Sequence, residues 1–264
     1  MINWYINLAY PLQAFIAALF TWFITSLGAA IVFLFKNMNK NVLDAMLGIS
    51  AGVMLAAAFF SLLSPAISLA ENLGMTPWLI ASAGLLCGGI LLFIGDKLFE
   101  RLMEKNKNIK STKRSLMLIF SITLHNIPEG LAIGVAFGSI GYGLEGATLI
   151  SALMLALGIG IQNFPEGSSV SLPLLREKIS PMKAFLCGSL SGIVEPIAAI
   201  IGAIIAIKIK MLLPILLSFA AGAMIYVIVQ ELIPESQTNE KKDLMALFTI
   251  FGFIIMMVFD VALG

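Results

Sequence analysis

The chain has 264 residues, of which 59% are hydrophobic and 12% are charged, and its formal net charge is +1. Soluble domains carry about 25% charged residues, so this composition and a mean hydropathy of +1.00 exclude an ordinary soluble protein. The sequence predicts a polytopic membrane protein.

Apolar stretches long enough to cross a hydrocarbon layer of about 30 Å recur along the whole chain. A lysine-rich and asparagine-rich loop at about 96–114 separates the third stretch from the fourth. The sequence therefore predicts one all-α transmembrane domain over residues 1–264. Its eight transmembrane helices are expected at about 9–35, 43–69, 77–95, 115–139, 146–174, 183–207, 211–233 and 244–263.

Lysine and arginine are distributed unevenly between alternate loops. Fourteen lie beside the loops after the first, third, fifth and seventh helices, and only Lys208 and Lys210 lie on the other side. Loops rich in basic residues stay in the cytoplasm. This pattern predicts that both termini are extracytoplasmic, which requires an even number of crossings.

Two similar hexapeptides lie in the fourth and fifth predicted helices. Residues 125–130 read His-Asn-Ile-Pro-Glu-Gly, and residues 162–167 read Gln-Asn-Phe-Pro-Glu-Gly. Within each copy, the first residue and the glutamate are four apart and share one helix face. The proline also removes a backbone donor and frees a carbonyl one turn earlier. Each copy is therefore a candidate half-site for a cation.

The two hexapeptide helices run in opposite directions in the predicted topology, so the repeat is inverted. A weaker sequence similarity links residues 50–54 in the second helix with residues 220–224 in the seventh, and a proline follows each. This indicates a 3+2+3 arrangement of helices about a pseudo-twofold axis in the membrane plane. Transporters built in this way bind their substrate near the midplane, where the repeats meet.

A third acid, Glu195, lies within the sixth apolar stretch and precedes Pro196. Buried acids are costly in a membrane, and no lysine or arginine lies in the apolar centre of any predicted helix. A proton or a bound cation must neutralise these acids. One imidazole with carboxylate and amide oxygens suits zinc, iron(II), manganese or cadmium better than copper(I). The candidate ligands are His125, Asn126, Glu129, Gln162, Asn163, Glu166 and Glu195.

Seven ligands exceed the need of one four-coordinate zinc ion. The adjacent pairs His125-Asn126 and Gln162-Asn163 each point about 100° apart around their helices, which favours a binuclear site. Two other functions are considered. An intramembrane zinc-dependent hydrolase is disfavoured because the chain has one histidine. A proton-coupled carrier of an organic substrate is disfavoured because, apart from Phe164, the hexapeptides lack the aromatic or arginine groups that hold such substrates.

The hexapeptides resemble the signatures of the fourth and fifth helices in the Zrt-/Irt-like (ZIP) family of divalent metal transporters, and the match covers essentially the whole chain. The glutamine at position 162 and the asparagine at position 163 are similar to the bacterial GufA/ZupT-like branch. The resemblance implies a multi-pass transporter of the cell membrane that is not an enzyme. It implies uptake of zinc into the cytoplasm as the first choice, with iron, manganese and cadmium as further transported metals.

The resemblance also implies an elevator-like motion of the central helices. Asp96, Glu231 and Glu235 are expected to line the cytoplasmic exit, and Asp260 the entrance. The expected partners are divalent metal ions and membrane lipid, without nucleic acid. A homodimer is one open alternative for the oligomeric state.

Overall fold

The structure is a computed structural model that describes residues 2–34, 39–105, 113–143, 147–176 and 178–263. Within these ranges every regular element is a helix. Among the described residues, seven segments are long and apolar enough to cross a membrane, which confirms the prediction of a polytopic membrane protein. They are Tyr10–Leu34, Lys40–Asn72, Pro77–Leu102, Leu149–Leu175, Pro181–Lys208, Lys210–Ser236 and Lys242–Ala262.

The first two of these segments contain more than one helix. In the first, a short helix follows the long one, and in the second a π-helical stretch interrupts the helix just before Pro65. In chain order the elements are α1 (Ile2–Ile6), α2 (Tyr10–Ala29), α3 (Ile31–Leu34), α4 (Lys40–Ala56), η1 (Ala57–Leu63), α5 (Ser64–Asn72) and α6 (Pro77–Lys105).

The second part of the chain begins with the two hexapeptide helices, which continue through Pro128 and Pro165. A second π-helical stretch precedes Pro234. The elements are α7 (Lys113–Ser139), η3 (Ile140–Tyr142), α8 (Leu149–Arg176), α9 (Pro181–Ser191), α10 (Val194–Lys208), η4 (Lys210–Leu212), α11 (Leu213–Val227), η5 (Ile228–Leu232), α12 (Ile233–Ser236), α13 (Lys242–Val258) and η6 (Phe259–Leu263).

Two elements differ from the sequence prediction. Helix α6 continues to Lys105 instead of ending near 95, and Lys97 and Glu100 form an ion pair of 2.8 Å along this extension. Because charged pairs three residues apart support a solvated helix, the helix can extend beyond its apolar part. The sixth predicted helix is two helices, α9 and α10, with turns at Gly192 and Ile193 between them. Residues 106–112 of the predicted loop lie outside the described residues.

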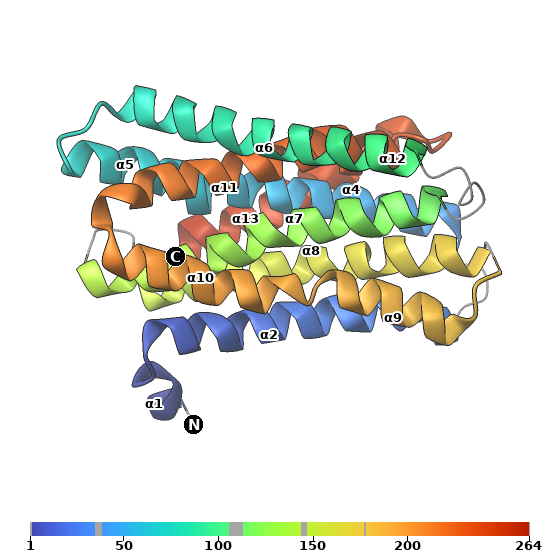
Figure 1. The fold of residues 1–264 in the computed structure, drawn as a ribbon, viewed down its shortest axis with the longest axis horizontal. Helices are drawn as coiled ribbons and strands as arrows, with labels where there is room; N and C mark the ends of the chain where they lie inside the picture. The colour runs from blue at the N-terminus through green and yellow to red at the C-terminus, as the bar shows by residue number, and fades with distance from the viewer. Residues whose placement is uncertain (1, 35–38, 106–112, 144–146, 177, 264) are drawn as a thin grey trace.

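The helices lie side by side in one bundle, with both termini toward the same end (Figure 1). The most extensive pairings are α7 with α10, α2 with α8, α4 with α13 and α6 with α11. Helices α2 and α6 lie on opposite sides of the bundle, and α7 and α8 lie between them. The two hexapeptides are thus held inside the protein.

A glycine at the end of each hexapeptide permits close backbone contact with a neighbouring helix. A methyl group at Gly130 would overlap the carbonyl oxygen of Glu195, and one at Gly167 would overlap that of Thr25. Helix α10 therefore packs on α7 as α2 packs on α8. Since small residues permit such approach between membrane helices, the two glycines fix the distance of α2 and α10 from the hexapeptides. Thr25 occupies in α2 the place of Glu195 in α10.

Candidate metal site

Three helices supply the side chains predicted to bind metal. Asn126 and Glu129 lie on α7, three others lie on α8, and Glu195 lies in the first turn of α10. The exposed fraction is 4% for Glu166 and 0% for Asn126, Glu129, Gln162, Asn163 and Glu195. His125 belongs to α7, but its side chain lies outside the described residues. Six of the seven predicted ligands are therefore confirmed as buried.

Hydrogen bonds connect the two hexapeptides with each other and with α10. The Gln162 amide donates to Glu129 Oε1, and Asn163 Nδ2 donates to Glu195 Oε1 at 2.7 Å. Asn126 Nδ2 donates to the carbonyl oxygen of Ser191 at 3.0 Å. Each amide is thus fixed through its nitrogen, which leaves its carbonyl oxygen available to another partner.

The site contains buried oxygen atoms without a hydrogen-bond partner among the described residues. Leaving a buried acceptor unsatisfied costs about 1–3 kcal/mol, and more if it is charged. Every such atom in the site is an oxygen, which a cation could satisfy and a further acceptor could not. They are Asn126 Oδ1, Glu129 Oε2, Gln162 Oε1, Asn163 Oδ1, Glu166 Oε1 and Glu166 Oε2.

The three carboxylates differ in how many oxygens are already occupied. Glu166 has two unpartnered oxygens, Glu129 has one, and both oxygens of Glu195 accept hydrogen bonds. All three lie within electrostatic range of one another. No group of three histidine, cysteine, aspartate or glutamate side chains stands at metal-binding distance among the described residues. The unpartnered amide oxygens of Asn126, Gln162 and Asn163 are the other candidate ligands beside these carboxylates.

Thr21 and Ser191 belong to the surroundings of the site, although the sequence analysis did not select them. The Thr21 hydroxyl donates to Glu195 Oε2, and the Thr21 carbonyl accepts from Asn163 Nδ2 at 3.4 Å. In the other hexapeptide, the Ser191 carbonyl accepts a hydrogen bond from Asn126 Nδ2. A hydroxyl pair one turn apart in an apolar helix, Thr21 and Thr25, was the available signal.

Two of the predicted exit residues lie together at the end of the site opposite the chain termini. Tyr226 of α11 hydrogen-bonds Asp96 of α6 and lies within electrostatic range of Glu231. Glu231 in turn lies within electrostatic range of Glu166. Glu235 is exposed on α12. Asp96 and Glu231 thus both lie near Tyr226, which the sequence analysis did not select.

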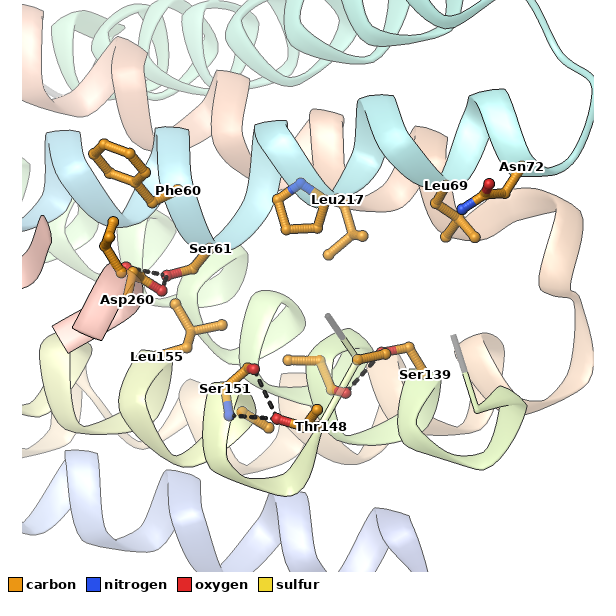
Figure 2. Close-up of a pocket in the computed structure, with 15 residues that line it drawn as sticks. Phe60, Ser61, Leu69, Asn72, Ser139, Thr148, Ser151, Leu155, Leu217 and Asp260 are labelled. Atoms are coloured by element: carbon orange, nitrogen blue, oxygen red, sulfur yellow. Dashed lines mark hydrogen bonds between the residues drawn. The ribbon is translucent and has the colours of Figure 1, made fainter. Parts of the chain in front are cut away.

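The predicted entrance residue Asp260 lines a cavity of about 210 Å³ between η1, α5, α7 and the start of α8. The Ser61 hydroxyl lies 2.7 and 2.8 Å from the two carboxylate oxygens of Asp260. Thr148 and Ser151 lie on the opposite wall, 2.8 Å apart (Figure 2). This cavity, which is lined mostly by apolar side chains, lies at the end of the bundle where both termini lie.

Comparison with known proteins identifies the family of the chain. A family model described as "ZIP Zinc transporter" matches residues 8–115 and 104–260. A zinc transporter ZIP11 of Xenopus tropicalis is 38% identical, over 96% of this chain and 98% of the relative. The zinc transporter GufA of Myxococcus xanthus is 34% identical, over 94% and 98%. The zinc transporter ZIPB of Bordetella bronchiseptica is 36% identical, over 91% and 78%. The chain therefore belongs to the ZIP family of zinc transporters.

Proposed function

We propose that this protein carries divalent metal ions, zinc foremost, across a membrane through the buried site between α7, α8 and α10. The main support is the set of buried side-chain oxygens without partners in the two hexapeptides. Relatives over nearly the whole chain are named zinc transporters. Membership of a transporter family also removes the hydrolase alternative.

Iron, manganese and cadmium are the further cargo that we propose. The described oxygens come from carboxylates and amides, which suit manganese as well as zinc. Gln162 contributes an amide oxygen at the start of the second hexapeptide, where the first has the single histidine of the chain. An amide oxygen in place of an imidazole nitrogen lowers the number of nitrogen ligands around the ion. It thereby widens the range of metals that the site binds.

We propose two neighbouring ion positions. The first uses Glu129, Gln162 and Glu166, which together offer four unpartnered oxygens. The second lies toward Glu195, with Asn126 and Asn163. Counting bound zinc per chain on purified protein by mass spectrometry tests this, since a limit of one ion at saturation contradicts the second position.

We propose eight crossings in a 3+2+3 inverted repeat, with α7 as the eighth. The helix pairs support this. Under the repeat, α2 corresponds to α9–α10 and α7 to α8, so the α2–α8 pair becomes the α10–α7 pair. In the same way, the α4–α13 pair becomes the α11–α6 pair.

Glycine contacts follow the same relation. A methyl group at Gly52 of α4 would overlap the carbonyl oxygen of Thr249, and one at Gly222 of α11 would overlap that of Leu85. Asp96 lies eight residues after Gly88 of α6, and Asp260 lies eight residues after Gly252 of α13. The two aspartates are thus equivalent residues at opposite ends of the protein.

We propose that ions enter past Asp260 and leave into the cytoplasm past Asp96, Glu231 and Glu235, in a protein of the cell membrane with extracytoplasmic termini. The cavity at Asp260 and the electrostatic link from Glu166 to Glu231 support this route. The outer faces of α6 and α13 expose large apolar side chains such as Leu91 and Phe251, as lipid contact requires.

Uptake of zinc into vesicles that contain the purified protein and a trapped zinc indicator tests the function. Wild-type protein should move zinc down its gradient, and Glu166→Ala should abolish the flux because it removes two of the unpartnered oxygens. Glu240→Ala removes an exposed acid and serves as the matched control. Equal flux through wild-type protein and Glu166→Ala would overturn the proposed site.

A further inference from the structure

The hydroxyl of Thr21 has two acceptors within reach and one proton to give. It contacts Glu195 Oε2, and it lies 3.0 Å from the carbonyl oxygen of Ala18 on its own helix. Thr21 is fully buried, so bulk water does not compete for this proton. The hydroxyl can therefore serve the carboxylate or its own helix.

Glu195 is the one carboxylate of the described site in which both oxygens accept a hydrogen bond from a neutral donor. Asn163 Nδ2 donates to Oε1 at 2.7 Å, and Thr21 donates to Oε2. An ion that approaches Glu195 therefore meets oxygens that already accept hydrogen bonds, and it competes with these donors for the carboxylate. Both oxygens of Glu166 lack such a partner among the described residues.

The Thr21 contact is the easier of the two to give up. If Asn163 left Glu195, its amide would keep only the carbonyl oxygen of Thr21 at 3.4 Å, which is a long hydrogen bond. If Thr21 left Glu195, its proton would keep the carbonyl oxygen of Ala18 at 3.0 Å. Serine and threonine commonly bond back to their own helix in this way.

The other half of the repeat already shows this second arrangement. Ser191 corresponds to Thr21 in two respects. Ser191 precedes Glu195 by four residues, as Thr21 precedes Thr25. The main-chain carbonyl oxygen of each accepts a hydrogen bond from a hexapeptide asparagine. No acid faces Ser191 in the described contacts, and its hydroxyl bonds back three residues to Gly188 at 2.8 Å.

We propose that Thr21 is an internal competitor for Glu195. Its hydroxyl occupies Oε2 while no ion is bound there, and it yields that oxygen to an arriving ion by turning to the Ala18 carbonyl. This inference rests on the proposed metal-transport function. It makes Thr21 a positioning residue that weakens ion binding at Glu195 and so helps a bound ion to leave.

The test compares zinc binding and thermal unfolding of the purified full chain in detergent, with a chelator and with saturating zinc. Thr21→Val keeps the side-chain shape and removes the donor, and Thr21→Ser restores the donor. Thr25→Val is the matched control, because Thr25 is equally buried, lies one turn along and donates to the Thr21 carbonyl at 3.2 Å. Thr21→Ala repeats the test if the valine variant folds poorly.

Thr21→Val should lower the unfolding temperature of the metal-free protein but not that of the zinc-loaded protein. The dissociation constant for zinc should fall about tenfold, because the lost donor favoured only the ion-free state. Thr21→Ser and Thr25→Val should bind zinc as wild type does. Equal loss of stability in both states, or weaker zinc binding by Thr21→Val, would overturn the inference. Failure of zinc to stabilise even the wild type would instead count against the transport site.

Discussion

Asn126 and Asn163 make the same hydrogen bond in the two halves of the molecule. Each asparagine follows the first residue of its hexapeptide and donates Nδ2 to a main-chain carbonyl, of Ser191 at 3.0 Å and of Thr21 at 3.4 Å. Only Asn163 reaches a carboxylate as well, because Glu195 has no acidic counterpart in α2. The two matching asparagines thus face different sets of charges, and several variants follow from this.

Replacing Gln162 with histidine should shift the metal preference toward zinc. Imidazole nitrogen is a softer ligand than amide oxygen and favours zinc over manganese. The ratio of zinc to manganese uptake should rise on the order of tenfold, which is the scale on which changes near a metal alter affinity. Gln237→His, outside the site, is the control. A ratio that does not change would show that Gln162 does not contact the ion.

Gly130→Ala should destabilise the protein and impair uptake. The added methyl group overlaps the carbonyl oxygen of Glu195, so α10 must move away from α7. Overpacking of this kind costs about 1–3 kcal/mol, which should appear as a lower unfolding temperature. At Gly89 the nearest atom to such a methyl group is 3.8 Å away, so Gly89→Ala should leave both properties near wild type. Similar behaviour of the two variants would contradict the close packing.

Asp260→Asn should weaken zinc capture without changing the maximal rate. The carboxylate lines the cavity that we propose as the entrance, and a charge there raises the local cation concentration. The KM for zinc should rise roughly tenfold at low ionic strength and less at high salt, where charges are screened. Asp243→Asn removes an exposed acid at the other end of α13 and is the control. A lower maximal rate at unchanged KM would assign Asp260 to a later step.

The folded protein should lose stability at alkaline pH because of the hydroxyl of Tyr5. Burial raises its pKa to about 12, and its hydroxyl donates to the Gln13 carbonyl at 2.9 Å. The unfolded chain loses this proton near pH 10, so stability is intact below that pH and declines as the pH rises toward 12. Unfolding temperatures of wild type and Tyr5→Phe, measured between pH 8 and pH 11, should converge as the pH rises. Parallel curves would exclude this role.

The sequence was sufficient to predict the membrane class, most helix positions and the burial of the ligands, because apolar length and the cost of buried acids act locally. The contact between Gln162 and Glu129 also follows from the hexapeptides. The hydroxyl pair Thr21 and Thr25 is visible in the sequence, but it does not reveal that Thr21 contacts an acid. Hydroxyls in apolar helices usually bond to their own carbonyls, as Thr25 and Ser26 do, and only the packing of α2 against α10 brings Thr21 to Glu195.

The break between α9 and α10 was equally hidden. Gly192 and Ile193 lie within a long apolar stretch, and a proline after Glu195 is compatible with a helix start as well as a kink. The π-helical stretches before Pro65 and Pro234 depend on packing around η1 and η5, which periodicity does not reveal.

The break between α9 and α10 changes the energetics of keeping an acid in lipid. Since α10 starts at Val194, Glu195 lies at a helix N-terminus, where the aligned peptide dipoles present the equivalent of about half a positive charge. In an unbroken helix the same carboxylate would sit among peptide groups without this field. The main chain itself therefore supplies part of the positive potential that stabilises the buried Glu195 carboxylate inside a membrane-spanning segment.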